Sequence, residues 1–81
     1  MMYVVYILYS QKTGRYYVGQ TQNLEERLNR HNCGRNKSTK PGMPWILVHK
    51  EEVPDRSTAV AREKQIKNMG SRRYLDRLRD Q

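Results

Sequence analysis

The feature that most constrains the fold is the stretch 17–31, in which a short strand runs directly into a helix. A tyrosine, a valine and a glycine at 17–19 end an apolar segment, and Asn23 follows at a position typical of a helix N-cap. Because Glu26 lies three residues after Asn23, the sequence predicts a capping box and a helix that begins there. Gly34 is placed to end this helix in the left-handed conformation.

The predicted helix carries its apolar and polar residues on different sides. At about 100° per residue, Leu24 and Leu28 form the apolar stripe that faces the core. Arg27 and His31 lie beside this stripe, one turn apart and on the same side. We therefore expect an arginine and a histidine at the edge of the core, next to Tyr17, which is the first indication of a functional site.

Hydrophobic patterning predicts the remaining elements. Strands are expected over 3–9, 15–20 and 45–49, and further helices from about Asp55 to Met69 and over 72–79. Residues 51–56 are expected to turn the chain between the third strand and the second helix. The predicted order is strand, strand, helix, strand, helix, helix, and the first strand is apolar on both faces, so it is central.

The first two strands are expected to pair as an antiparallel hairpin. If residues 11–14 form the loop, Leu8 lies opposite Tyr17, and Tyr6 shares a sheet face with Tyr17. A register change of one residue would separate the two tyrosines, so their proximity depends on this loop.

Glu63 is the unusual residue of the second predicted helix. Ala59, Ile66 and Met69 form its apolar stripe, and Glu63 lies within that stripe. A carboxylate on a core-facing line is costly unless it is paired or faces a cleft. Two interpretations remain open: a functional carboxylate, or a structural ion pair with an arginine such as Arg27.

Charge indicates a polyanionic partner. The 81 residues contain 16 Lys and Arg against 8 Asp and Glu, a formal net charge of +8. On so short a chain, which we expect to form one domain over 1–81, this excess is typical of nucleic-acid binding, although a solvated basic surface would look the same. No helix combines a long apolar face with a basic one, and the apolar run 4–8 is too short to cross a bilayer, so no membrane partner is expected.

Two local features bear on partners and location. The segment 35–44 has no apolar period and carries three cations, Arg35, Lys37 and Lys40, which either contact phosphates or simply solvate a connection. The single cysteine, Cys33, forms no intramolecular disulfide and is typical of a reducing compartment. We expect a soluble, cytoplasmic protein.

The unusual residues together suit phosphodiester hydrolysis. Arg27 offers a guanidinium that can bind two phosphate oxygens, and Glu63 can hold one Mg²⁺ or Mn²⁺. A tyrosine, Tyr6 or Tyr17, could act as a base if nearby cations favour its phenolate, and His31 could relay the proton or bind phosphate. Each of these roles is plausible on residue chemistry, and none is unique.

These residues also occur in an order that resembles the GIY-YIG nuclease family. Residues 4–6 stand where the family has its first triplet, and 17–19 where it has its second, about ten residues later. The family's remaining site residues are matched by Arg27, His31 and Glu63. The resemblance covers essentially the whole chain. It is greatest to small single-domain members related to the nuclease half of the bacterial excision-repair C subunit and to homing endonucleases.

The resemblance implies an α/β fold with a three-stranded antiparallel sheet flanked by helices. It implies one Mg²⁺ or Mn²⁺ ion at Glu63 and in-line attack by water on the phosphate. In the family's terms Tyr6 would be the general base, with His31 assisting it. Tyr17 would position water or phosphate, and Arg27 would stabilise the transition state.

The sequence also departs from the family pattern. Val4 and Val5 replace the glycine and isoleucine of the first triplet, and neither position supplies chemistry. Gly19 is retained and would let the backbone pass close to the cleft. Many members carry an asparagine a dozen or so residues after the glutamate, and residues 75–78 contain none.

Three hypotheses follow. The first is a metal-dependent endonuclease that hydrolyses DNA, in repair or recombination, with DNA favoured over RNA and a protein partner allowed. The second is a nucleic-acid-binding module on the same scaffold with weak or no cleavage. The third is a structural or interaction domain whose charge serves solubility.

Overall fold

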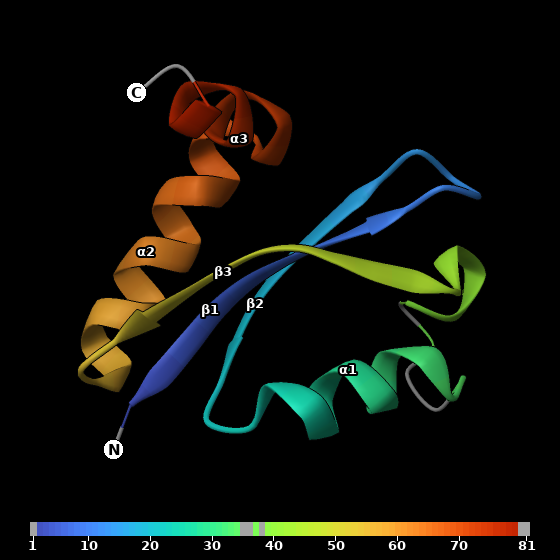
Figure 1. Ribbon diagram of the computed structural model, residues 1–81, viewed down its shortest axis with the longest axis horizontal. Coiled ribbons are helices and arrows are strands. Elements are labelled where there is room, and N and C mark those ends of the chain that lie inside the picture. The colour runs from blue at the N-terminus through green and yellow to red at the C-terminus, as the bar shows by residue number, and fades with distance from the viewer. Residues whose placement is uncertain (1, 35–36, 38, 80–81) are drawn as a thin grey trace.

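The computed structural model describes residues 2–34, 37 and 39–79. Its elements follow the predicted order, with a short 3₁₀ turn before the third strand (Figure 1). The elements are β1 Tyr3–Ser10, β2 Tyr16–Thr21, α1 Leu24–Asn32, the 3₁₀ turn η1 Lys40–Gly42, β3 Trp45–Val53, α2 Arg56–Met69 and α3 Ser71–Arg79.

The strands form one antiparallel sheet in the order β2-β1-β3, so β1 is central, as its apolar pattern predicts. Leu8 pairs with Tyr17, and Tyr6 pairs with Gly19. This is the predicted register. It places Tyr6 and Tyr17 on the same face of the sheet, because directly paired residues point to the same side.

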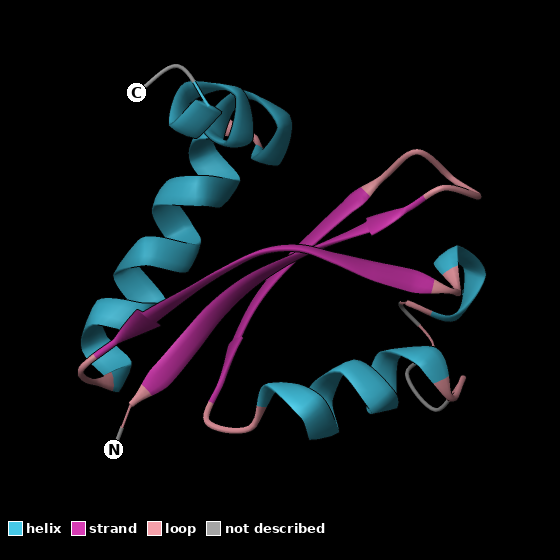
Figure 2. Ribbon diagram, viewed as in Figure 1, coloured by secondary structure: helices cyan, strands magenta, loops and turns pink. Residues whose placement is uncertain are grey.

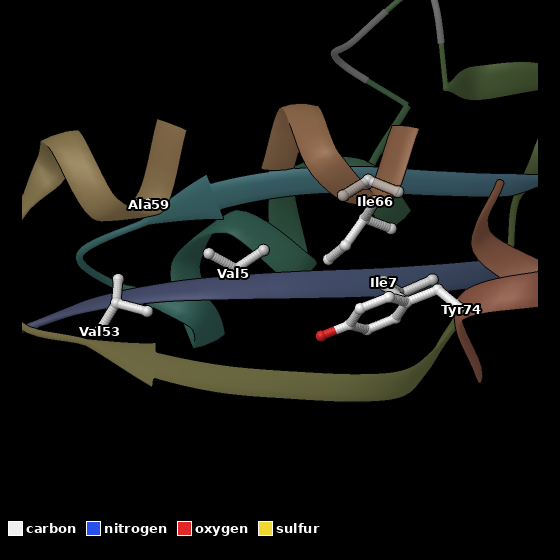
Figure 3. Close-up of a cluster of buried hydrophobic side chains, with 7 residues drawn as sticks. Val5, Ile7, Val53, Ala59, Ile66 and Tyr74 are labelled. Carbon is white, nitrogen blue, oxygen red and sulfur yellow. The ribbon is translucent and has the colours of Figure 1, made fainter. Parts of the chain in front are cut away.

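Helices cover both faces of the sheet (Figure 2). On one face α2 and α3 pack on β1 in an apolar cluster (Figure 3) made of Val5, Ile7, Val18, Val53, Ala59, Ile66 and Tyr74. On the other face α1 and the segment before β3 enclose a second cluster made of Tyr6, Leu8 and Trp45, with Tyr17, Leu24, Leu28, Met43 and Leu47 packed against it. The tyrosines of the candidate site therefore belong to the face that α1 covers.

The third strand is longer than the sequence predicts. It was expected to end at His49 and to be followed by a turn over 51–56, but β3 runs from Trp45 to Val53. Val53 pairs with Tyr3 at the start of β1, so β1 pairs with β3 from end to end apart from an irregularity at Val48. The charged residues near its end hid this continuation, because they break the apolar pattern that identified the strand.

Side chains from three elements stabilise the Glu51 carboxylate within β3. Tyr74 of α3 donates a hydrogen bond to Glu51 Oε2, and His49 Nε2 lies 2.7 Å from the same oxygen. Arg62 Nε of α2 lies 3.6 Å from Oε1. Although burial acts to raise the pKa of Glu51, the hydrogen bonds of Tyr74 and His49 and the charge of Arg62 hold it below its ordinary value.

The first helix begins with only half of the predicted capping box. Asn23 is the N-cap, and its Oδ1 accepts a hydrogen bond from the Glu26 backbone N–H at 3.1 Å. The reciprocal contact is replaced, because the Asn23 backbone N–H donates to Thr21 Oγ1 at 3.1 Å. The Glu26 carboxylate instead lies 3.8 Å from Arg30, one turn further along. Gly34 follows the helix with φ +80°, as predicted for its end.

Among the described residues, no helix is both long and apolar enough to cross a membrane.

Candidate functional site

Three aromatic side chains from two strands and a helix form the centre of the candidate site. Tyr6 of β1, Tyr17 of β2 and His31 of α1 constitute this tyrosine–histidine cluster. Tyr6 Oη lies 3.1 Å from His31 Nε2, which is within hydrogen-bonding distance. The Tyr17 and His31 rings meet edge to face with centroids 4.6 Å apart, and the Tyr6 and Tyr17 rings stack at 6.4 Å. Tyr6 and His31 are each only 1% exposed, whereas Tyr17 is half-buried.

Gly19 makes this arrangement possible. An added Cβ at Gly19 would lie 2.5 Å from Tyr6 Oη and 2.7 Å from Tyr6 Cζ, so the Tyr6 ring lies directly over the glycine. Since Gly19 is part of β2, which is an edge strand, the Tyr6 hydroxyl reaches the edge of the sheet. The group that comes close to the backbone at Gly19 is therefore the Tyr6 ring.

Thr39 holds the other side of the histidine. His31 Nδ1 lies 3.2 Å from Thr39 Oγ1, and Thr39 is 1% exposed. A neutral imidazole has one donor and one acceptor, so one of the two hydroxyls, Tyr6 or Thr39, donates to the ring and the other accepts from it. Sequence reasoning missed Thr39, because it lies in a segment without apolar periodicity.

The loop around Thr39 is anchored to the core rather than merely solvated. Trp45 Nε1 donates a hydrogen bond to the Thr39 carbonyl oxygen at 2.7 Å. Asn32 at the end of α1 accepts from the Trp45 backbone N–H at 2.6 Å and donates to its carbonyl oxygen at 3.1 Å. Gly42 packs against the Trp45 ring, which leaves no room for a side chain at residue 42. These contacts fix the position of Thr39 relative to His31.

Arg27 and Glu63 both act on Tyr6 electrostatically. Burial raises the pKa of Tyr6 to about 12, and Tyr17 and Glu63 contribute in the same direction. Arg27 opposes this shift through its charge and through a side-chain interaction with the phenol. Because Tyr6 overlies the edge strand, charges from α1 on one face and α2 on the other both reach it.

His31 is held in its neutral form. Burial, and secondarily the neighbouring Arg27 guanidinium, lower its pKa below the ordinary 6.5. At neutral pH the ring can therefore accept a proton through one nitrogen while it donates through the other.

Glu63 does not form the ion pair with Arg27 that was one interpretation of its position. Lys67 Nζ, one turn along α2, donates to Glu63 Oε2 at 3.2 Å instead. The Glu63 side chain is 25% exposed, which places it at the margin of the core rather than inside it. Within the described part of the chain, Arg27 has no carboxylate within ion-pair distance, so its guanidinium is available to an anion.

The donor set around Glu63 suits one weakly held divalent ion. In the described ranges no cluster of three or more His, Cys, Asp or Glu residues could form a complete protein cage for a metal. Mg²⁺, however, commonly binds through one or two carboxylates and completes its coordination with water and substrate phosphate. The partly exposed carboxylate of Glu63 fits this second arrangement, and the predicted single Mg²⁺ or Mn²⁺ at Glu63 stays a prediction.

The predicted phosphate contacts in the loop are only partly described. Lys37 and Lys40 are exposed, and Arg35 lies outside the described residues. Their role in nucleic-acid binding stays a prediction. Cys33 is exposed and its thiol is free.

Strand order, register and side-chain cluster together define a small α/β domain whose antiparallel three-stranded sheet carries a tyrosine–histidine cluster on one face. The GIY-YIG catalytic domain profile matches residues 2–75, and the chain belongs to this family. The resemblance stated from the two triplets, Arg27, His31 and Glu63 is thereby confirmed at the level of the family.

Relatives and a solved structure agree with this assignment. A UPF0213 protein of Syntrophus aciditrophicus is 48% identical over 68 residues, which are 80% of this chain and 76% of that protein. A UPF0213 protein of the archaeon Natronomonas pharaonis is 40% identical over 63 residues, covering 76% and 73% of the two chains. The solution NMR structure of the UPF0213 protein BH0048 from Bacillus halodurans superposes with a TM-score of 0.58 at 28% identity, covering 96% of this chain and 83% of that one.

Proposed function

We propose that this protein is a divalent-metal-dependent endonuclease that hydrolyses phosphodiester bonds of DNA, with a role in repair or recombination. Membership of a nuclease family supports the reaction class. The observation that carries the proposal is the contact of the Tyr6 hydroxyl with His31 at 3.1 Å, next to an arginine without a carboxylate partner among the described residues. A structural role alone does not require a buried phenol, an imidazole and a guanidinium at one sheet edge.

The proposed proton path begins at Tyr6. His31 Nε2 accepts the phenol proton, and the phenolate oxygen then removes a proton from the attacking water, whose oxygen bonds to phosphorus as the bond to the leaving oxygen breaks. The leaving oxygen takes up a proton from solvent, and the His31 imidazolium releases one to solvent. His31 is suited to the first step because it is neutral at pH 7. Thr39 keeps the ring in place through Nδ1.

The remaining residues bind and orient the phosphate. Arg27 stabilises the charge that accumulates on the phosphate oxygens in the transition state. Tyr17, which is half-buried beside His31, positions the water or the phosphate. A Mg²⁺ or Mn²⁺ ion held by Glu63 would supply positive charge to the phosphate and the leaving oxygen.

A specific observation favours the alternative, a binding module without cleavage. Lys67 already occupies one oxygen of Glu63, and residues 75–78 contain no asparagine. Leu75, the first residue of this stretch, packs against the apolar core on the face that α2 and α3 cover. The pKa of about 12 at Tyr6 also disfavours a phenolate in the free protein. This alternative predicts strong, salt-sensitive binding without product.

The test is cleavage of labelled single-stranded, duplex and branched DNA with Mg²⁺, with Mn²⁺ and with EDTA. The parent is compared with Arg27→Ala and Glu63→Gln, and with matched controls Arg30→Ala and Glu25→Gln on the exposed side of α1. We expect metal-dependent cleavage by the parent and both controls, and at least a hundredfold loss in the two site variants.

Undiminished cleavage by both site variants would contradict the proposed site. Absence of cleavage by the parent, together with binding that weakens steeply with salt, would establish the binding module instead. Absence of both would leave the structural or interaction domain as the function.

A further inference from the structure

A polar hollow lies beside the candidate site, at the end of the sheet where β1 begins, β2 ends and α2 starts. Figure 1 shows these three segments at the same end of the molecule. The hollow has a volume of about 360 Å³. Its walls include Arg27, Arg56, Gln20, Thr21, Tyr3 and Glu26. Arg27 therefore borders both the tyrosine–histidine cluster and this hollow.

The two arginines of the hollow are not neutralised by the protein. Among the described residues, neither Arg27 nor Arg56 has a carboxylate within ion-pair distance. Glu26 borders the hollow, but its carboxylate faces Arg30 at 3.8 Å. Asp55, next to Arg56, accepts a hydrogen bond from the Thr58 backbone N–H at 2.8 Å. The hollow therefore retains an excess of positive charge.

The position of the hollow fits the path of a polynucleotide strand. Tyr6 Oη lies over Gly19, and Thr21 is two residues further along β2, a distance of about 7 Å at the usual strand rise. Successive phosphates of a stacked strand are separated by about 3.4 Å along its axis. A phosphate at the candidate site would thus have a neighbour, one or two nucleotides away, at the hollow.

We propose that Arg56 and Gln20, together with Arg27, form a subsite for a neighbouring phosphate of the substrate strand. A guanidinium group can donate hydrogen bonds to two phosphate oxygens at once, and the Gln20 side-chain amide adds an uncharged donor. This inference rests on the proposed function for the identity of the strand. It assigns Arg56, which lies on α2 far from the two motif triplets, as a binding residue.

The hollow on the opposite side of the cluster has a different character. It has a volume of about 560 Å³ and is lined by aromatic and small groups that include Tyr16, Tyr17, Gly42 and Trp45, with Arg15 as its one cation among the described residues. A strand lying along β2 would therefore meet its second phosphate contact on the Arg56 side. The two hollows therefore differ in charge, and the Arg56 side offers more cations to a bound strand.

The test measures binding without cleavage. Tetrathymidylate is titrated into the isotope-labelled protein in EDTA, and the dissociation constant is obtained from NMR shifts for the parent, Arg56→Gln and the control Arg77→Gln. Arg77 is an exposed arginine of α3 that does not line the hollow, so the control removes the same charge away from the proposed subsite. We expect Arg56→Gln to weaken binding roughly fivefold and to reduce the slope of log K against log salt by about 0.7, with Arg77→Gln unchanged.

A complementary change in the oligonucleotide shows which phosphate binds at the subsite. Each linkage of tetrathymidylate is replaced in turn by an uncharged methylphosphonate. In the parent, one replacement is expected to cost at least the fivefold of Arg56→Gln, and in the Arg56→Gln protein the penalty of that replacement is expected to be about fivefold smaller, because only the contacts of Arg27 and Gln20 are then lost. Equal losses in Arg56→Gln and Arg77→Gln, or an unchanged penalty for every linkage in Arg56→Gln, would overturn the subsite.

The outcome is independent of catalysis, because no divalent ion is present. If the parent fails to cleave DNA but Arg56→Gln still weakens binding selectively, the nuclease proposal fails and the subsite stands. Because Arg56 is exposed, its substitution is expected to leave the urea denaturation midpoint unchanged.

Discussion

Replacing Gly19 with alanine tests the central geometric relation of the site. The new Cβ would lie 2.5 Å from Tyr6 Oη and 2.7 Å from Cζ, both far inside van der Waals contact. Tyr6 is 1% exposed and is enclosed by the α1 face of the core, so its ring cannot move away freely. The backbone of β2 or the Tyr6 ring must shift, and the hydrogen bond to His31 is expected to break.

The expected cost follows from these contacts. Forcing an extra carbon into a packed core costs about 1–3 kcal/mol, and the lost hydrogen bond of Tyr6 adds about 1 kcal/mol. Replacing glycine restricts the unfolded chain and returns about 0.5 kcal/mol. We therefore expect Gly19→Ala to lower the free energy of unfolding by about 2 kcal/mol, which in a domain of this size lowers Tm by about 10 °C.

A double-mutant cycle isolates the contact. Urea denaturation is measured for the parent, Gly19→Ala, Tyr6→Leu and the double variant. Leucine is too short to reach over residue 19, so in the Tyr6→Leu background Gly19→Ala is expected to be neutral or stabilising by about 0.5 kcal/mol. If Gly19→Ala costs the same in both backgrounds, the tyrosine ring is not the cause and the reasoning is refuted.

Three further predictions concern protonation and charge. Glu51→Gln should destabilise the protein at pH 7, because the lowered pKa of Glu51 gives stability that is present above about pH 4.5; urea denaturation should show the difference shrinking as pH falls below that value. His31 has a lowered pKa, so it contributes stability above pH 6.5 that is lost on acidification; His31→Gln should flatten the pH dependence of unfolding just below pH 6.5, and an unchanged slope would contradict a buried neutral ring. Lys67→Met should tighten Mg²⁺ binding at Glu63, because it removes the ammonium at 3.2 Å; calorimetry that shows equal or weaker binding would exclude that competition.

Local sequence signals predicted most of the fold. Asn23 and Asp55 marked the starts of α1 and α2, because their side chains cap these helices. Capping is a local interaction that needs no tertiary information. The register of β1 and β2 was predictable because the hairpin loop fixes which residues face each other. Both predictions depend on residues close together in the chain.

The features that sequence reasoning missed depend on distant contacts. The continuation of β3 past His49 is stabilised by Tyr74, which lies 23 residues after Glu51. Thr39 contacts His31 because Trp45, itself held by Asn32, binds the Thr39 carbonyl oxygen. The partner of Glu63 was also open, since helical spacing allows a pair within the helix as readily as one across the sheet.

The resting state of the proposed site explains why substrate and ion would act together. With a pKa of about 12, deprotonating Tyr6 at pH 7 costs about 7 kcal/mol, so the free protein holds a neutral phenol against a neutral imidazole. Glu63 adds to this cost although Lys67 partly balances its charge, and among the described residues it is Arg27 that reduces it. A single carboxylate binds Mg²⁺ well only when phosphate completes the coordination. In the proposed nuclease, positive charge beyond that of Arg27 would therefore reach Tyr6 only with the bound strand and its ion, and the base would become available only when there is a bond to cleave.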